Sequence, residues 1–203
     1  MKAIAVAITG ASGAIYATRT VAALLSRGVH VELVVSDYGR RLVRDELGES
    51  ASLDGLKAFL AGKYGEDVAA GSITLHNNRD LGATIASGSH GCSGMVIVPC
   101  SMKTLAGVAH GLSRNLIERA ADVMLKERRT LVLVPRETPM SLPQLKNMVL
   151  CAEAGAMILP AMPAFYQLPK TLDDLADFMA GKILSSLGFE HELYPQWTGQ
   201  VGR

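Results

Sequence analysis

Aromatic residues, excess charge and long apolar runs are all scarce in this chain. Phe, Trp and Tyr make up 5% of its 203 residues, so an extended surface for stacking nucleic-acid bases is not expected. Lys and Arg (20) nearly balance Asp and Glu (19), which argues against bulk binding of nucleic acid or of a membrane surface. No apolar run approaches the roughly 18 residues that span a bilayer.

Cysteine is also scarce: Cys92, Cys100 and Cys151 are the only three, and no two share a Cys-x-x-Cys spacing. Such a set predicts small buried side chains in a reducing compartment rather than a disulfide framework. The apolar run at the N-terminus, about six residues long, is too short for a signal peptide. We therefore expect a soluble, cytoplasmic protein.

What is abundant is apolar sequence, which at 49% can fill a sizeable core. Apolar runs predict strands at 3–8, 29–35, 73–75, 95–98, 130–134 and 156–159. Helical patterns cover 14–26, 37–47, 102–109, 115–126, 141–154 and 171–187. A polar, Gly-rich stretch covers 48–71, and 82–94 is predicted to be a loop or a loosely helical connection. Strands that alternate with crossover helices predict an α/β fold, a three-layer Rossmann-like (flavodoxin-like) parallel sheet with helices on both faces. We expect one domain, residues 1–203, with a C-terminal tail from about 188.

The first strand is followed by a loop of small residues, Gly10 to Gly13, that leads into a helix. Small residues let a ligand approach the backbone, and free N–H groups at a helix start suit an anion. Ser12 and Ile15 occupy positions that the dinucleotide fingerprint reserves for Gly, and no Walker A motif is present. The loop predicts a flavin mononucleotide or another phosphoester; the alternative is a tight turn with Ser12 as N-cap.

Polar side chains follow three further strands. Because parallel strands end at one edge of a sheet, these side chains are expected to lie at the same edge. Ser101-Met102-Lys103-Thr104 opens a helix with two hydroxyls and a cation; a simple capped helix is the alternative. Asp37 after Ser36 is interpreted as a helix cap rather than a ribose ligand. Arg136-Glu137 lies between prolines, where Arg suits a phosphate and Glu can move a proton.

Three other patterns are given structural interpretations. The charge run 126–129 is typical of a solvated helix end. Tyr166 and Lys170 have the dehydrogenase Tyr-x-x-x-Lys spacing, but Pro169 interrupts the helix it requires. The Asp-Asp-x-x-Asp run at 173–177 is interpreted as a helix cap rather than a magnesium–diphosphate site. The five histidines show no metal-ligand spacing, so no metal is predicted.

Six segments together resemble flavin prenyltransferases of the UbiX type: 9–16, 99–104, 115–123, 125–129, 134–139 and 163–166. Each is modest alone, but their joint order is specific, and the resemblance runs from Ile4 to Trp197. It implies a Rossmann-like homo-oligomeric flavoprotein, commonly a dodecamer.

The resemblance also implies two sets of ligand residues. FMN would be held by Gly10, Ala11, Ser12, Ser36, Ser101, Met102, Lys103, Thr104 and Arg136. The phosphate of dimethylallyl phosphate would meet Ser87, Arg119, Lys126, Tyr166 and Lys182, some of them from neighbouring subunits. Family members often carry Arg at position 182, and Lys182 keeps that charge without the bidentate fork. Glu137 would also contact this substrate. Trp197 would cover the prenyl tail; the alternative is plain packing of the C-terminal tail.

The reaction implied by the resemblance is transfer of the dimethylallyl group to N5 and then C6 of reduced FMN, without a metal. Glu137 and Ser12 would shuttle protons, and a basic cluster that includes Lys126 would stabilise the departing phosphate. The product, prenylated FMN, would serve a UbiD-type decarboxylase. The sequence leaves open whether the donor is a phosphate or a diphosphate.

Three rival functions remain: an aromatic-acid decarboxylase acting by itself, a flavin-dependent cysteine decarboxylase of the same fold, and a non-catalytic flavin-binding subunit. The stretch 135–139 favours prenyl transfer over cysteine decarboxylation.

Overall fold

The computed structural model describes residues 3–195, which form one six-stranded parallel sheet. The strands are Ala3–Ile8 (β1), His30–Val35 (β2), Ser72–His76 (β3), Cys92–Cys100 (β4), Thr130–Pro135 (β5) and Met157–Ile158 (β6). Their spatial order is β3-β2-β1-β4-β5-β6, and every neighbouring pair is parallel. This is the strand order of the Rossmann fold, and the predicted fold class is confirmed.

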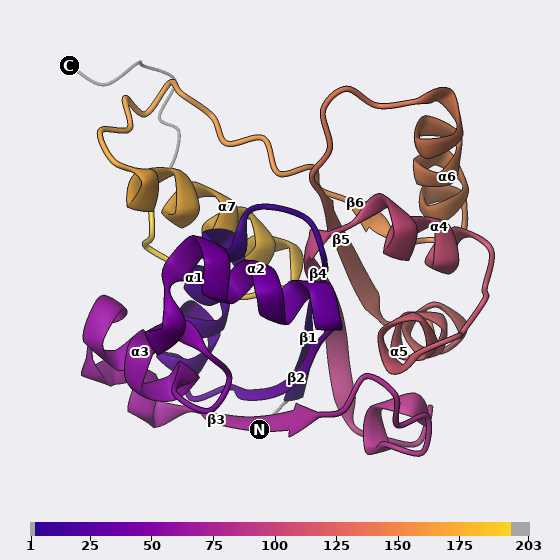
Figure 1. Cartoon of the computed structure of the whole chain (residues 1–203), viewed down its shortest axis with the longest axis horizontal. Helices are drawn as coiled ribbons and strands as arrows, with labels where there is room; N and C mark the ends of the chain where they lie inside the picture. The colour runs from indigo at the N-terminus through magenta and orange to yellow at the C-terminus, as the bar shows by residue number, and fades with distance from the viewer. Residues whose placement is uncertain (1–2, 196–203) are drawn as a thin grey trace.

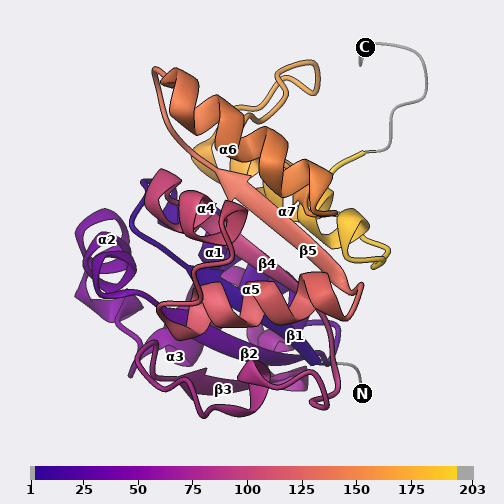
Figure 2. The same cartoon turned by 90° about the vertical axis from the view of Figure 1, so that its right-hand side faces the viewer.

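Helices cover both faces of the sheet, as Figures 1 and 2 show. One layer holds Ala14–Leu25 (α1), Asp37–Leu47 (α2), Leu56–Tyr64 (α3) and Leu172–Ser186 (α7). The opposite layer holds Met102–Ala109 (α4), Leu116–Lys126 (α5) and Leu142–Glu153 (α6). Within residues 3–195, no helix has the length and apolarity that crossing a membrane requires.

The strands read as continuous apolar runs because their alternate residues enter two different cores. In β1, Ile4, Val6 and Ile8 pack with α1, α3 and α7 in one core. Ala5 and Ala7 face the other core, together with residues of α4, α5 and α6. A side-chain period of two along a strand covered on both faces produces this division.

Two segments differ from the sequence-based prediction. The polar, Gly-rich stretch 48–71, where no helix is predicted, contains α3, because Leu56 and Leu60 lie one helical turn apart and both are buried. Strand β4 begins at Cys92, three residues earlier than predicted, because Cys92 and Gly94 already pair with β1. The rest of the stretch 82–94 carries only a single 3₁₀ turn, Thr84–Ala86.

The sheet order reverses between β1 and β4, which places a crevice outside their carboxyl ends. Thr9, buried at this point, joins the two loops that form the crevice. Its hydroxyl donates to the carbonyl of Pro99 at 2.8 Å and accepts from the N–H of Ser101 at 2.7 Å. The loops after β1 and β4 are therefore fixed relative to each other, and the candidate site lies at this edge.

Candidate active site

The N-terminal ends of three helices, α2, α4 and α5, line a cavity of about 270 Å³ at the carboxyl edge of the sheet. Its lining residues are Gly10, Ser36, Asp37, Tyr38, Asn78, Ser101, Lys103, Thr104, Asn115, Ile117 and Glu118. The first N–H groups of each helix have no partner within the helix, and each helix dipole is positive at this end. We name this cavity the helix-start cradle; its backbone favours an anion.

Each of the three helices begins with a capping side chain that also faces the cradle. Ser36 Oγ accepts from the N–H of Gly39 at 3.0 Å, so Ser36 is the cap of α2 and the prediction that Asp37 caps this helix is wrong by one residue. Ser101 Oγ accepts from the N–H of Thr104 at 3.3 Å, and Asn115 Oδ1 accepts from the N–H of Glu118 at 3.0 Å. The structure therefore brings together five of the predicted cofactor residues: Gly10, Ser36, Ser101, Lys103 and Thr104.

Two carboxylates line the helix-start cradle, and each is paired with an arginine. Glu118, 2% exposed, accepts from the backbone N–H of Arg114 at 2.9 Å and from its guanidinium at 3.1 and 3.3 Å. Burial raises the pKa of Glu118, but the hydrogen bonds from Arg114 outweigh it and hold that pKa below its usual value. Asp37 pairs with Arg79 at 3.2 Å. The cradle therefore keeps its preference for an anion.

Two glycines allow α2 to approach the end of β1. A Cβ atom added to Gly10 would lie 2.7 Å from the Cβ of Tyr38, and one added to Gly39 would lie 2.5 Å from the carbonyl oxygen of Ile8. No side chain fits at either position without a shift of the backbone. The close approach places the start of α2 beside the loop after β1, and the hydroxyls, the Lys103 cation and the helix-start amides gathered there fit a flavin phosphate.

The start of α1 differs from its sequence-based prediction. The N–H groups of Gly13 and Ala14 donate to Glu46 Oε2 at 3.0 and 2.8 Å, so the expectation that these amides are free for an anion is wrong. Sequence reasoning missed Glu46. The available signal was its spacing, because Val43 is buried and Glu46, three residues later, lies on the same side of α2. A negative charge from Glu46 also adds to burial in raising the pKa of Tyr16.

The Arg136-Glu137 pair joins the same edge. Arg136 Nε donates to the carbonyl of Ser12 at 3.3 Å, and its backbone N–H donates to the carbonyl of Cys100 at 3.4 Å. Glu137, half-buried, accepts from the N–H of Thr138 at 3.1 Å. Ser12, Ser101 and Glu137 therefore lie on one edge, while Ala11 and Met102 are buried beneath the loops.

The predicted prenyl-phosphate residues Ser87, Arg119 and Lys126 lie elsewhere in the chain. Arg119 and Lys126, seven residues apart, share one face of α5, where Arg119 pairs with Asp122 at 2.8 Å and Lys126 pairs with Glu127. Lys126 precedes β5 and Glu137 follows it, so the two residues lie near opposite ends of this strand. A six-residue strand is about 16 Å long, which sets the approximate separation of the two residues. Within one chain, Lys126 and the neighbouring Ser87 loop therefore lie away from the helix-start cradle, whereas Arg119 directly follows Glu118 of the cradle.

Tyr166 and Lys182 form a third group, beside α7. The ring of Tyr166 packs edge-on against Phe178 with centroids 6.2 Å apart, and Lys182 is exposed one turn after Phe178. Trp197 lies outside the described residues.

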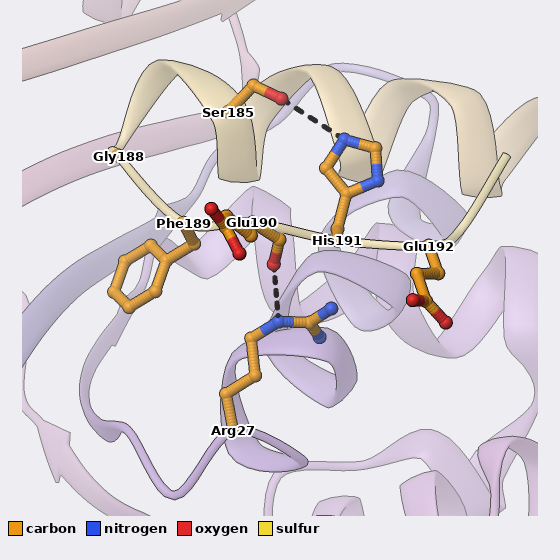
Figure 3. A pocket seen from close by; sticks show the side chains of 7 residues that line it. All are labelled: Arg27, Ser185, Gly188, Phe189, Glu190, His191 and Glu192. Atoms are coloured by element: carbon orange, nitrogen blue, oxygen red, sulfur yellow. Dashed lines mark hydrogen bonds between the residues drawn. The ribbon is translucent and has the colours of Figure 1, made fainter. Parts of the chain in front are cut away.

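A larger cavity, of about 750 Å³, lies between the end of α1 and the end of α7 (Figure 3). Its polar groups already bond one another, since Arg27 Nε donates to the carbonyl of Glu190 at 2.9 Å and Ser185 Oγ lies 3.1 Å from His191 Nε2. None of the predicted site residues lines it. Chemistry rather than size therefore identifies the helix-start cradle as the candidate site.

The Asp-Asp-x-x-Asp run has a structural role. Thr171 and Asp174 form a reciprocal capping box at the start of α7, with distances of 2.9 and 3.1 Å. Asp173 pairs with Lys63, and Asp177 pairs with Arg19. The capping interpretation is confirmed. Among residues 3–195, no group of three or more His, Cys, Asp or Glu side chains is arranged to hold a metal ion.

Comparison with known proteins places the chain in a family. The Flavoprotein family profile matches residues 1–183. The "Flavin prenyltransferase UbiX" of Halalkalibacterium halodurans is 50% identical over 197 residues, covering 95% of this chain and 91% of that protein. The protein of the same name from Methanothermobacter thermautotrophicus is 44% identical over 201 residues, covering 98% of this chain and 96% of that protein.

Solved structures agree. AnUbiX (PadA1), crystallised with FMN and dimethylallyl pyrophosphate, aligns with a TM-score of 0.87 at 38% identity over 98% of both chains. A dodecameric FMN-dependent UbiX-like decarboxylase from Escherichia coli O157:H7 aligns with a TM-score of 0.85 at 40% identity, covering 98% of this chain and all of that one. The cysteine decarboxylase TvaF, at 13% identity and a TM-score of 0.53, shares the fold alone. The chain belongs to the Flavoprotein family and, within it, to the flavin prenyltransferases of the UbiX type.

Proposed function

We propose that this chain transfers a dimethylallyl group from dimethylallyl phosphate to reduced FMN. The observation that carries the proposal is the helix-start cradle, where three helix N-termini favour an anion beside the loops after β1, β4 and β5. The relative crystallised with FMN and dimethylallyl pyrophosphate supports the same pair of ligands. When bound, reduced FMN supplies N5 and C6 as the atoms that accept the prenyl group.

The chain's own residues hold the flavin. Ser36, Ser101 and Thr104 offer hydroxyl groups to its phosphate, and Lys103 adds a positive charge. Arg136, which already holds the loop after β1 through Ser12, offers the rest of its guanidinium to the same ligand. The backbone at 10–11 and the start of α4 at Met102 complete the proposed FMN contacts.

We assign proton transfer at this edge to Glu137 and Ser12. Glu137 is half-buried and follows Arg136, whose guanidinium donates to the carbonyl of the exposed Ser12. Glu46 adds a second carboxylate, at the N–H groups of Gly13 and Ala14 next to Ser12.

The prenyl phosphate is bound by Ser87, Arg119, Lys126, Tyr166 and Lys182, with Trp197 against the prenyl tail. Because Ser87 and Lys126 lie about 16 Å from Glu137 within one chain, a neighbouring copy supplies them in a homo-oligomer, together with Arg119 from the same face of α5. The half-exposed face of α5 that carries Arg119 and Lys126 suits this role, as does the dodecameric state of a relative. Lys126 stabilises the departing phosphate as its bond to the prenyl carbon breaks.

The test is mass spectrometry of the flavin after the purified chain has been given reduced FMN and dimethylallyl phosphate, with a chelator present. The expected result is FMN heavier by one isoprene unit. An unchanged flavin mass would contradict the proposal, and decarboxylation of a C-terminal peptide cysteine would favour the alternative. A parallel reaction with the diphosphate identifies the preferred donor.

The finer biological setting is part of the same proposal. The whole chain, residues 1–203, acts as one domain with a tail from about 188, and the product serves a UbiD-type decarboxylase in the cytoplasm. Three buried cysteines without a disulfide are compatible with a reducing compartment. If the product of this chain fails to activate an apo-decarboxylase of that type, the partner assignment is wrong.

A further inference from the structure

The loop of residues 87–90 lies at the amino edge of the sheet, directly against the end of α5. A Cβ atom added to Gly88 would lie 2.1 Å from Glu127 Oε1 and 2.8 Å from Lys126 Nζ. The two serines of the loop bond each other, with Ser87 Oγ 2.9 Å from Ser89 Oγ. Ser87 and Lys126, two of the proposed prenyl-phosphate ligands, are therefore neighbours, although they are 39 residues apart in sequence.

Arg129 holds this loop from one side. Its Nη1 donates to the carbonyl of His90 at 2.8 Å, and its Nη2 donates to the carbonyl of Gly88 at 2.6 Å. The planar guanidinium matches this pair of acceptors, and a lysine could reach only one of them with comparable geometry. The sequence-based expectation that the whole run 126–129 is a solvated helix end is therefore wrong for Arg129, which is half-buried.

A buried carboxylate holds the loop from the other side. Glu32, 4% exposed in the middle of β2, accepts from His90 Nε2 at 2.9 Å. It also bonds His76 at 2.6 Å, and His30 lies 3.5 Å away. Burial raises the pKa of Glu32, but the hydrogen bonds from His76 and His90 outweigh it and lower that pKa, so the anchor is an ionised carboxylate.

We infer that Arg129, together with the Glu32–His90 pair, positions the 87–90 loop so that Ser87 and Lys126 form one preorganised phosphate-binding surface. This inference rests on the proposed function. Arg129 donates both its bonds to backbone carbonyls and so does not occupy the side chains of Ser87 and Lys126, whose partners, Ser89 and Glu127, are close neighbours in sequence that a phosphate can replace. Fixing two ligand groups in advance lowers the entropy that binding must overcome.

The test compares steady-state kinetics of the parent chain and four variants with saturating reduced FMN. Arg129→Ala should raise the KM for dimethylallyl phosphate roughly tenfold, while FMN affinity stays within about twofold, because the helix-start cradle lies at the opposite edge. Arg129→Lys should fall between Ala and the parent chain. Free guanidinium ion added to the Arg129→Ala chain should lower its KM again.

Two further variants separate positioning from folding and from charge. Gly88→Ala leaves Arg129 in place but pushes the flexible ends of Lys126 and Glu127 aside, so it should raise the same KM with little change in melting temperature. Arg128→Asn removes the adjacent positive charge; Arg128 is exposed with φ of 53°, a conformation that Asn tolerates. It should leave KM unchanged.

The outcomes are distinct. If the parent chain does not prenylate FMN, the proposed function fails. If it does, and Arg129→Ala shows the KM of the parent chain, or loses FMN affinity and melting temperature in parallel with activity, the positioning role is overturned. An equal rise in KM for Arg128→Asn would also overturn it, since net charge alone would then explain the effect.

Discussion

The two edges of the sheet hold their proposed ligand residues in different ways. At the carboxyl edge, the helix-start cradle is built from neutral caps, helix N-termini and glycines, with Ser36, Ser101 and Asn115 each satisfying an amide of the helix they begin. At the amino edge, the 87–90 loop is held by charged groups, Arg129 and Glu32, that reach it from distant parts of the sequence. Each capping contact of the helix-start cradle joins residues three apart in sequence, whereas each contact that holds the 87–90 loop joins residues more than 30 apart.

The largest expected effect concerns the proton carrier at the carboxyl edge. Glu137→Gln keeps the size of the side chain but removes its ability to exchange a proton, so turnover should fall by about 10²- to 10⁴-fold while FMN still binds. Stopped-flow and mass spectrometry would measure the rate of prenylated flavin formation. Normal turnover by this variant would remove Glu137 from the mechanism and leave Glu46 as the carboxylate to examine.

The second effect tests whether the cradle depends on its buried carboxylate. Glu118→Ala removes the partner of Arg114 and opens space beside Gly107, so the free energy of unfolding should fall by about 2–3 kcal/mol. Urea denaturation measures this directly. Glu153→Ala, at an exposed position of α6, is the matched control and should change stability by less than about 0.5 kcal/mol. Equal losses in both variants would show that Glu118 has no special role.

The third effect sharpens the assignment of the flavin to the carboxyl edge. Arg136→Ala should weaken FMN binding roughly tenfold, because it removes a charged donor and releases the loop at Ser12. Flavin fluorescence would give the dissociation constant. Arg40→Ala, an exposed cation of α2 that does not line the cradle, should leave it unchanged. An unaltered FMN affinity in Arg136→Ala would refute the proposed role of Arg136.

The smallest effect is an acid sensitivity located at the amino edge. Because the pKa of Glu32 is lowered in the folded chain, the unfolded chain binds more protons in acid, and stability is lost as the pH falls below the ordinary Glu value of about 4.3. Glu32→Gln should flatten this part of the pH–stability curve. A variant curve that keeps the full acid slope would assign the loss to other carboxylates, such as Glu118.

The sequence could predict features that depend on neighbouring residues, and it could not predict contacts between distant segments. The strands and the cap at Ser101 were predictable, because each depends on residues within a few positions of one another. The cap of α2 was predicted one residue late, at Asp37 instead of Ser36. Glu46 on the α1 amides and Arg129 on the 87–90 loop were not, because each contact joins segments more than 30 residues apart. Helix α3 was missed for a different reason: only Leu56 and Leu60 of its nine residues are buried, too few to outweigh its polar, Gly-rich surroundings.

The central claim is that each chain carries two half-sites at opposite edges, so that a complete site needs two copies. Mixing chains that carry Glu137→Gln with chains that carry Lys126→Ala, followed by dissociation and reassembly, tests it through the rate of FMN prenylation. Each variant alone should be nearly inactive, and the mixture should recover about one quarter of the parent activity, because random assembly reunites intact halves in that share of sites. A mixture as inactive as its components would contradict the claim and place both residues in one site of a single chain.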